Sequence, residues 1–172
     1  TTSGCRSTLP SERGPRRRTQ TEFLMIIDCH GHYTTAPKAL EDWRNRQIAG
    51  LEDPAVAPKA AELAISDDDL RASIETNQLA RMKERGSDLT IFSPRASFMA
   101  HHIGNFETSA TWAAICNELC HRVSRLFPDH FIGAAMLPQS PGVDPKTCIP
   151  ELERCVTEYG FVAINLNPDP SG

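Results

Sequence analysis

Long apolar runs and aromatic side chains are scarce in this sequence of 172 residues. The longest apolar run, residues 23–27, is about a quarter of the roughly 20 residues that a membrane-spanning helix needs. A basic excess is also missing, because 18 Lys and Arg residues stand against 22 Asp and Glu residues, giving a net charge of -4. A general nucleic-acid-binding protein would carry a basic face. The composition therefore argues against both a membrane and a nucleic acid as partners of this chain.

Motifs for several other chemistries are absent as well. We find no Gly-rich phosphate loop and no Ser or Cys nucleophile motif. The chain has six cysteines, but no apolar segment of the length that a secretory signal peptide requires. We therefore expect reduced thiols and a cytoplasmic protein rather than a disulfide scaffold.

The first 24 residues differ in composition from the rest of the chain. They are rich in Ser, Thr, Arg, Gly and Pro, and five Arg against two Glu give them a charge of +3. Because they show no hydrophobic periodicity, we expect a disordered leader. The chain opens with Thr and its first methionine is Met25, so we interpret the leader as upstream translation or a fragment start rather than a transit peptide. Residues 25–172 are expected to form the folded domain.

Strand-like and helix-like segments alternate from residue 24 onward. Short apolar runs at residues 24–28, 88–93, 131–137 and 161–166 predict four strands, and helical spacing fills the intervals between them. Alternation of this kind is typical of an α/β fold with parallel strands and right-handed crossovers. A complete (β/α)8 barrel has eight such units and about 250 residues. The fold class that we predict is therefore α/β, as the N-terminal half of a barrel with about four parallel strands.

The first predicted strand ends in the sequence Asp28-Cys29-His30-Gly31-His32. Side chains alternate along a strand, so His30 and His32 are expected on one face with Cys29 opposite. Two imidazoles at the end of one strand can bind the same divalent metal ion, and Asp28 could orient one of them. A catalytic zinc site usually has three protein ligands and a water molecule, so the pair predicts only part of such a site.

Four segments together resemble the amidohydrolase superfamily. Residues 28–32 are similar to the Asp-x-His-x-His opening of the branch that contains aminocarboxymuconate-semialdehyde decarboxylase. Residues 93–102, 135–140 and 162–169 resemble more narrowly the 4-oxalomesaconate hydratases of that branch. The resemblance extends over residues 25–172.

This resemblance implies a distorted barrel that binds one Zn2+ ion, forms a homo-oligomer and acts on a small polycarboxylate. The implied reaction is hydration of a carbon–carbon double bond in an unsaturated keto tricarboxylate from protocatechuate or gallate ring cleavage. His30 and His32 match the first two metal ligands, whereas a third His, an acidic ligand and the general acid/base would come from later strands. A zinc-dependent decarboxylase or hydrolase of the same superfamily remains an alternative, as does an inactive half barrel.

Polar residues after the later strands are candidates for binding the substrate. Arg95 follows the second predicted strand, where barrel enzymes place active-site groups, and a guanidinium suits a carboxylate. His101 and His102 follow in the same loop, and adjacent residues seldom both point inward. Asn165 and Asn167 end the fourth strand on one face, where they could bind substrate or simply terminate the strand.

Overall fold

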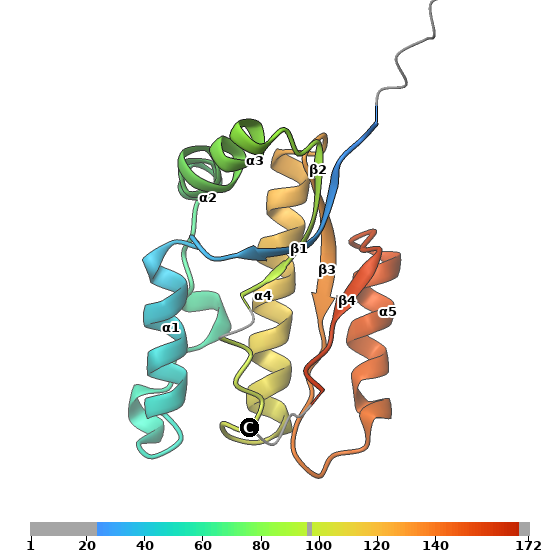
Figure 1. The fold of residues 1–172 in the computed structure, drawn as a ribbon. Helices are drawn as coiled ribbons and strands as arrows, with labels where there is room; N and C mark the ends of the chain where they lie inside the picture. Colours follow the sequence, from blue (N-terminus) through green and yellow to red (C-terminus); the bar gives the residue numbers. More distant parts are fainter. Residues whose placement is uncertain (1–23, 96–97, 169–172) are drawn as a thin grey trace, which may run out of the picture.

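The structure is a computed structural model that describes residues 24–95 and 98–168. The leader at residues 1–23 therefore lies outside the described residues, as do residues 96–97 and 169–172. Four parallel strands form one sheet in the order β1-β2-β3-β4 (Figure 1). Their bounds are β1 (Ile27–Tyr33), β2 (Leu89–Pro94), β3 (Phe131–Met136) and β4 (Ala163–Asn165). This topology confirms the predicted half barrel.

Helices connect the strands. They are α1 (Lys38–Ala49), α2 (Asp67–Ser73), α3 (Ala80–Arg85), α4 (Phe106–Leu126) and α5 (Ile149–Thr157). In Figure 1, α4 runs alongside β2 and β3, with α1 on one side of it and α5 on the other. Among the described residues, no helix is both long enough and apolar enough to cross a membrane.

The core lies between the sheet and α4. The apolar side chains of α4 follow the helical spacing read from the sequence, and Trp112, Leu119 and Val123 are buried against the sheet. The Trp112 ring stacks on Trp43 of α1 at 6.1 Å between centroids. A contiguous core therefore joins α1 and α4 to the strands that carry the candidate site.

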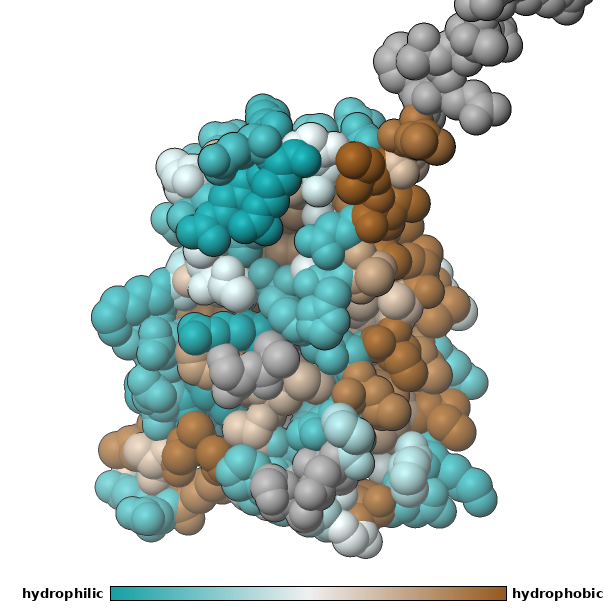
Figure 2. Space-filling view, viewed as in Figure 1, coloured by the Kyte–Doolittle hydropathy of each residue, from teal (hydrophilic) through white to brown (hydrophobic). Residues whose placement is uncertain are grey.

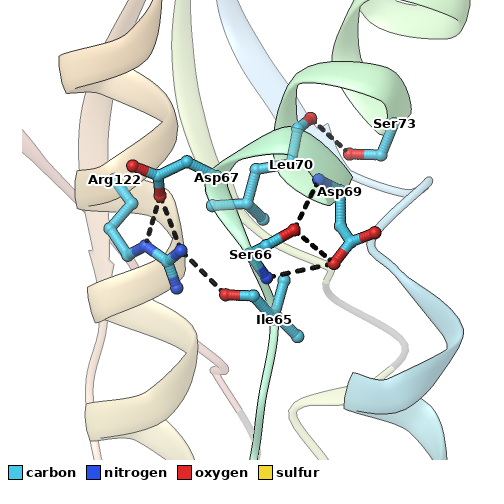
Figure 3. A network of polar contacts seen from close by, with 7 residues as sticks. All are labelled: Ile65, Ser66, Asp67, Asp69, Leu70, Ser73 and Arg122. Carbon is cyan, nitrogen blue, oxygen red and sulfur yellow. Dashed lines mark hydrogen bonds and ion pairs between the residues drawn. The ribbon is translucent and has the colours of Figure 1, made fainter.

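The start of α2 is fixed by a polar network that reaches α4 (Figure 3). The Ser66 hydroxyl accepts a hydrogen bond from the Asp69 backbone N–H at 3.1 Å, and the Asp69 carboxylate accepts one from the Ser66 N–H at 3.0 Å. This reciprocal pair is a capping box. Arg122 of α4 bonds the Asp67 carboxylate at 2.6 Å and the carbonyl of Ile65 at 2.8 Å. The network holds the first turn of α2 against the long helix of the core.

A π-helical turn at residues 74–79 separates α2 from α3. The sequence predicts one helix here with an indistinct apolar face, because Leu70 and Ile74 fall on a different side from Leu79 and Met82 at α-helical spacing. All four side chains are nevertheless buried. The π-turn pairs residue i with residue i+5, so it adds one residue and brings Ile74 and Leu79 onto the same face.

The outer edges of the sheet carry exposed apolar side chains. Ile27 of β1 is 49% exposed and Ile164 of β4 is 47% exposed. Figure 2 shows hydrophobic surface where β1 begins and along the side of the molecule on which β4 and α5 lie. Buried strands of a closed barrel would cover such residues, so the exposure agrees with an incomplete barrel.

Candidate metal centre

His30 and His32 lie together at the end of β1. Their ring centroids are 4.7 Å apart and their planes are nearly perpendicular. Both rings line a hollow of about 270 Å³, and both also line a smaller hollow of about 100 Å³. The prediction that strand alternation would bring the two imidazoles together therefore agrees with the geometry.

A β-bulge changes what surrounds the pair. The register of β1 on β2 shifts between Asp28 and Gly31, so that two residues of β1 lie opposite one residue of β2. Strict alternation would turn Cys29 away from both imidazoles. In the structure Cys29 instead lines the smaller hollow with them, because the bulge interrupts the alternation.

The hydrogen bonds of His32 determine which ring nitrogen is free. Its Nδ1 lies 3.1 Å from the carbonyl oxygen of Pro94 and 2.7 Å from the Ser93 hydroxyl. A carbonyl oxygen can only accept, so Nδ1 carries the hydrogen. The lone pair then resides on Nε2, which is the form in which a histidine binds a metal ion.

Ser93 links His32 to two other strands. Its hydroxyl accepts from His32 and donates to the carbonyl of Gly31 at 3.0 Å. The amide of Asn165 on β4 donates to the same hydroxyl at 3.4 Å. Our sequence reasoning did not single out Ser93, although a polar residue at the end of a buried strand is a recognisable pattern. The serine holds the imidazole in its orientation, while the Pro94 carbonyl determines the tautomer.

Asp28 bonds the backbone of the pair. Its carboxylate accepts a hydrogen bond from the His30 N–H at 3.0 Å. This contact fixes the bulged backbone that places the His30 ring. The contacts that orient the His32 ring come instead from Ser93 and Pro94.

The two histidines fit a metal ion as two nitrogen ligands. Within residues 24–95 and 98–168, no group of three or more His, Cys, Asp or Glu side chains is placed to hold one. Zn2+ in a catalytic site takes three protein ligands on average, with imidazole nitrogen among its preferred donors. The described residues thus supply part of a ligand set.

Arg95 follows β2 but lies in neither hollow that the imidazoles line. Its guanidinium packs over the Phe98 ring at 4.6 Å from the centroid. The arginine lines a small apolar hollow with Tyr33, Leu40 and Trp112. The side chain is exposed, so its charge is open to solvent at the carboxyl end of the sheet.

The neighbouring histidines point in different directions. His101 is only 1% exposed, whereas His102 is exposed. His101 Nδ1 lies 2.9 Å from the Ser109 hydroxyl, which itself donates to the carbonyl of Gln139 at 2.6 Å. Burial, together with the positive charge of Arg44, lowers the pKa of His101. His101 is therefore a neutral group that ties the loop to α4, and only His102 of the pair faces solvent.

The two asparagines at the end of β4 have different surroundings. Asn165 lines the smaller hollow beside both imidazoles. The backbone of Asn167 is held by the Gln139 side chain, which accepts from its N–H at 2.8 Å and donates to its carbonyl at 2.7 Å. The structure thus brings Asn165 to the histidine pair and places Asn167 on a neighbouring loop.

Comparison with known proteins identifies the family. The amidohydrolase family model matches residues 27–172. A 2-keto-4-carboxy-3-hexenedioate hydratase of Sphingobium sp. strain SYK-6 is 56% identical over 150 residues, which are 87% of this chain and 43% of that protein.

Solved structures give a consistent result. A 4-oxalomesaconate hydratase from Rhodopseudomonas palustris matches with a TM-score of 0.81 and 78% identity, over 86% of this chain and 43% of that one. A dihydroxybenzoic acid decarboxylase from Polaromonas sp. JS666, solved with bound manganese and an inhibitor, matches with a TM-score of 0.53 and 23% identity. That match covers 83% of this chain and 38% of the decarboxylase. The chain spans less than half the length of these relatives.

Proposed function

The chain belongs to the amidohydrolase family, and from this we propose that it carries the first part of the metal site of a hydratase. The proposed reaction adds water to the carbon–carbon double bond of an unsaturated keto polycarboxylate from aromatic ring cleavage. The observation that supports it most directly is the His30–His32 pair, in which hydrogen bonding leaves Nε2 of His32 free. The hydratase names of relatives at 78% and 56% identity support this reaction class.

We propose Zn2+ as the ion, with His30 and His32 as two of its ligands. When bound, such an ion supplies a Lewis acid that polarises a substrate oxygen or lowers the pKa of a water molecule. The Pro94 carbonyl and the Ser93 hydroxyl both face His32 Nδ1, which leaves Nε2 as the nitrogen available to a metal ion. Asp28 fixes the backbone beneath His30.

The substrate's carboxylates need donors around the same end of the sheet. Asn165 has an amide in the hollow beside the imidazoles, and Arg95 and His102 are exposed on the loop that follows β2. An arginine fork can bind a carboxylate through two parallel hydrogen bonds. His101 serves this arrangement indirectly, by holding the loop to α4.

A metal-dependent decarboxylase is the alternative reaction within the same superfamily. Its support is weaker, because two dihydroxybenzoate decarboxylases and one 5-carboxyvanillate decarboxylase that match in structure are 20–23% identical, and likeness at that level indicates the fold alone. The two hydratases are 78% and 56% identical. The domain boundary after residue 24 and the formation of a homo-oligomer remain predictions.

An assay with 4-oxalomesaconate and Zn2+ tests the proposal. Hydration removes the conjugated double bond, so ultraviolet absorbance should fall when this chain is joined to the remaining strands of the barrel, and should remain constant when the same protein carries His30→Ala or His32→Ala. His130→Ala is a matched control, because His130 lies before β3 and lines neither hollow of the metal centre. Unchanged turnover in both site variants would contradict the proposal. Release of carbon dioxide would indicate the decarboxylase, and a wild-type chain without turnover would indicate the inactive half barrel.

A further inference from the structure

The π-helical turn at residues 74–79 directs a glutamine toward the metal centre. Gln78 lines the larger hollow together with His30 and His32. Its Nε2 donates to the backbone carbonyl of His32 at 3.2 Å and to the Thr34 hydroxyl at 3.4 Å. Its Oε1 accepts a hydrogen bond from the Thr35 hydroxyl. One side chain therefore uses both ends of its amide to hold three residues at and beyond the end of β1, His32, Thr34 and Thr35.

Additional bonds connect the same two segments. The Tyr33 hydroxyl pairs with the Ser73 hydroxyl at 2.6 Å, and the carbonyl of Ser73 lies 3.0 Å from the Thr35 hydroxyl, whose single hydrogen it shares with Gln78 Oε1. The Ser73 hydroxyl in turn donates to the carbonyl of Leu70. The segment that contains His32 is thus attached to the end of α2, whose first turn is itself anchored to α4 (Figure 3).

The unusual helical geometry accounts for the reach of Gln78. A π-turn shifts the residues that follow it by one position relative to an α-helix, which is about 100° of rotation. Thr76 and Asn77 donate to the carbonyls of Ala72 and Ser73, where the π-turn interrupts the regular backbone bonding. π-turns within α-helices are frequently found at functional sites.

We infer that Gln78 is a positioning residue for the proposed metal ligand His32. It fixes the backbone from which the imidazole projects, while Ser93 fixes the ring from the other side. The inference rests on the proposed function, because it assigns a role to Gln78 at that same metal site. It predicts that Gln78 affects metal affinity beyond its effect on folding stability.

Gln78→Met tests this inference, because methionine keeps the length of the side chain and removes its three hydrogen bonds. The matched control is Thr76→Val, since Thr76 lies in the same π-turn and bonds only its own helix. Zn2+ is titrated into each folded chain by calorimetry, well below its melting temperature. Loss of groups that support metal ligands weakens binding about 10- to 100-fold, so we expect about a tenfold loss for Gln78→Met and little change for Thr76→Val.

A second measurement uses the metal-free chain. In the NMR spectrum, exchange of the His32 Nδ1–H with water should be at least about tenfold faster in Gln78→Met than in the wild type, because the ring loses its fixed position. Equal exchange rates and equal Zn2+ affinities in the two chains would overturn the inference. If Gln78→Met does not fold, Thr35→Val removes the bond that holds Gln78 Oε1, one of the three bonds of that amide, and should accelerate the same exchange. A wild-type chain that does not bind Zn2+ would contradict the metal site itself, while the exchange rates would still decide the role of Gln78.

Discussion

Replacing Ser93 by alanine should weaken metal binding without unfolding the chain. Ser93 is 5% exposed, and its hydroxyl accepts from His32, donates to Gly31 and receives the Asn165 amide. Ser93→Ala removes these contacts and leaves His32 Nδ1 with the Pro94 carbonyl at 3.1 Å as its partner. The ring keeps its tautomer but is held less firmly.

The size of the effect follows from that remaining bond. Losing a group that orients a metal ligand costs about 10- to 100-fold in affinity, and each factor of ten equals about 1.4 kcal/mol. Because the Pro94 carbonyl is retained, we expect the lower end of that range. Zn2+ binding measured by calorimetry should therefore weaken about tenfold in Ser93→Ala.

The control for this experiment is Ser124→Ala. Ser124 lies on α4, where its hydroxyl donates to the carbonyl of Cys120 in the same helix, far along the chain from the histidine pair. Its Zn2+ affinity should equal that of the wild type. If Ser93→Ala also binds Zn2+ within about twofold of the wild type, the hydrogen bond does not orient His32 for metal binding, and the reasoning is refuted.

Three further substitutions test the fold around the site by urea unfolding. Burial keeps the pKa of His101 below its ordinary value of 6.5, so the unfolded chain binds more protons in acid than the folded chain does. The free energy of unfolding should therefore fall as the pH drops below about 6.5. His101→Gln should remove up to about 1.4 kcal/mol per pH unit of that slope, and an unaltered slope would exclude His101 as its source. Asn117→Leu should lower the free energy of unfolding by about 3 kcal/mol, because the buried Asn117 amide bonds both the N–H and the carbonyl of Met136. A loss below about 1 kcal/mol would mean that these two backbone groups find other partners. Gly31→Ala should lower the free energy of unfolding by about 1–3 kcal/mol, because the added carbon would lie 2.1 Å from Thr90 Cγ2. A variant as stable as the wild type would show that β1 can move away from β2 without loss of stability.

The strand pattern was predictable because buried parallel strands leave short apolar runs that end at polar residues. Each of the four runs in the sequence overlaps an observed strand, and the order of the strands follows the tendency of consecutive strands to lie next to each other. The pairing of His30 with His32 was also predictable, because a single glycine separates them and residues i and i+2 of a strand lie on the same face.

Other features of the site depend on departures from regular periodicity. The bulge that brings Cys29 into the smaller hollow and the π-turn that directs Gln78 to His32 each add one residue to a regular element. Periods of 2.0 and 3.6 residues contain no information about such insertions. One indication of the π-turn was present in the sequence: no single α-helical face includes the four apolar residues Leu70, Ile74, Leu79 and Met82, which are all buried.

The surroundings of Arg95 and His101 could not be predicted because they depend on tertiary packing. The sequence places both in the loop after β2, where barrel enzymes bind their substrates. Packing instead stacks Arg95 on Phe98 and encloses His101 against Ser109, so that the two side chains differ in their access to solvent. The proximity of Asn165 to His32 likewise requires Ser93 as the link between β4 and β1.

X-ray absorption at the zinc edge of the Zn2+-loaded chain tests the central claim most directly, because it reports which atoms bind the metal. We predict two imidazole nitrogen ligands at about 2.0–2.1 Å in the wild type and one fewer in His30→Ala and in His32→Ala. Thiolate ligation would appear instead as a sulfur shell at about 2.3 Å, for which Cys29 is the exposed cysteine beside the pair. A sulfur shell, or a nitrogen shell that is the same in the wild type and both variants, would contradict the assignment of His30 and His32 as metal ligands.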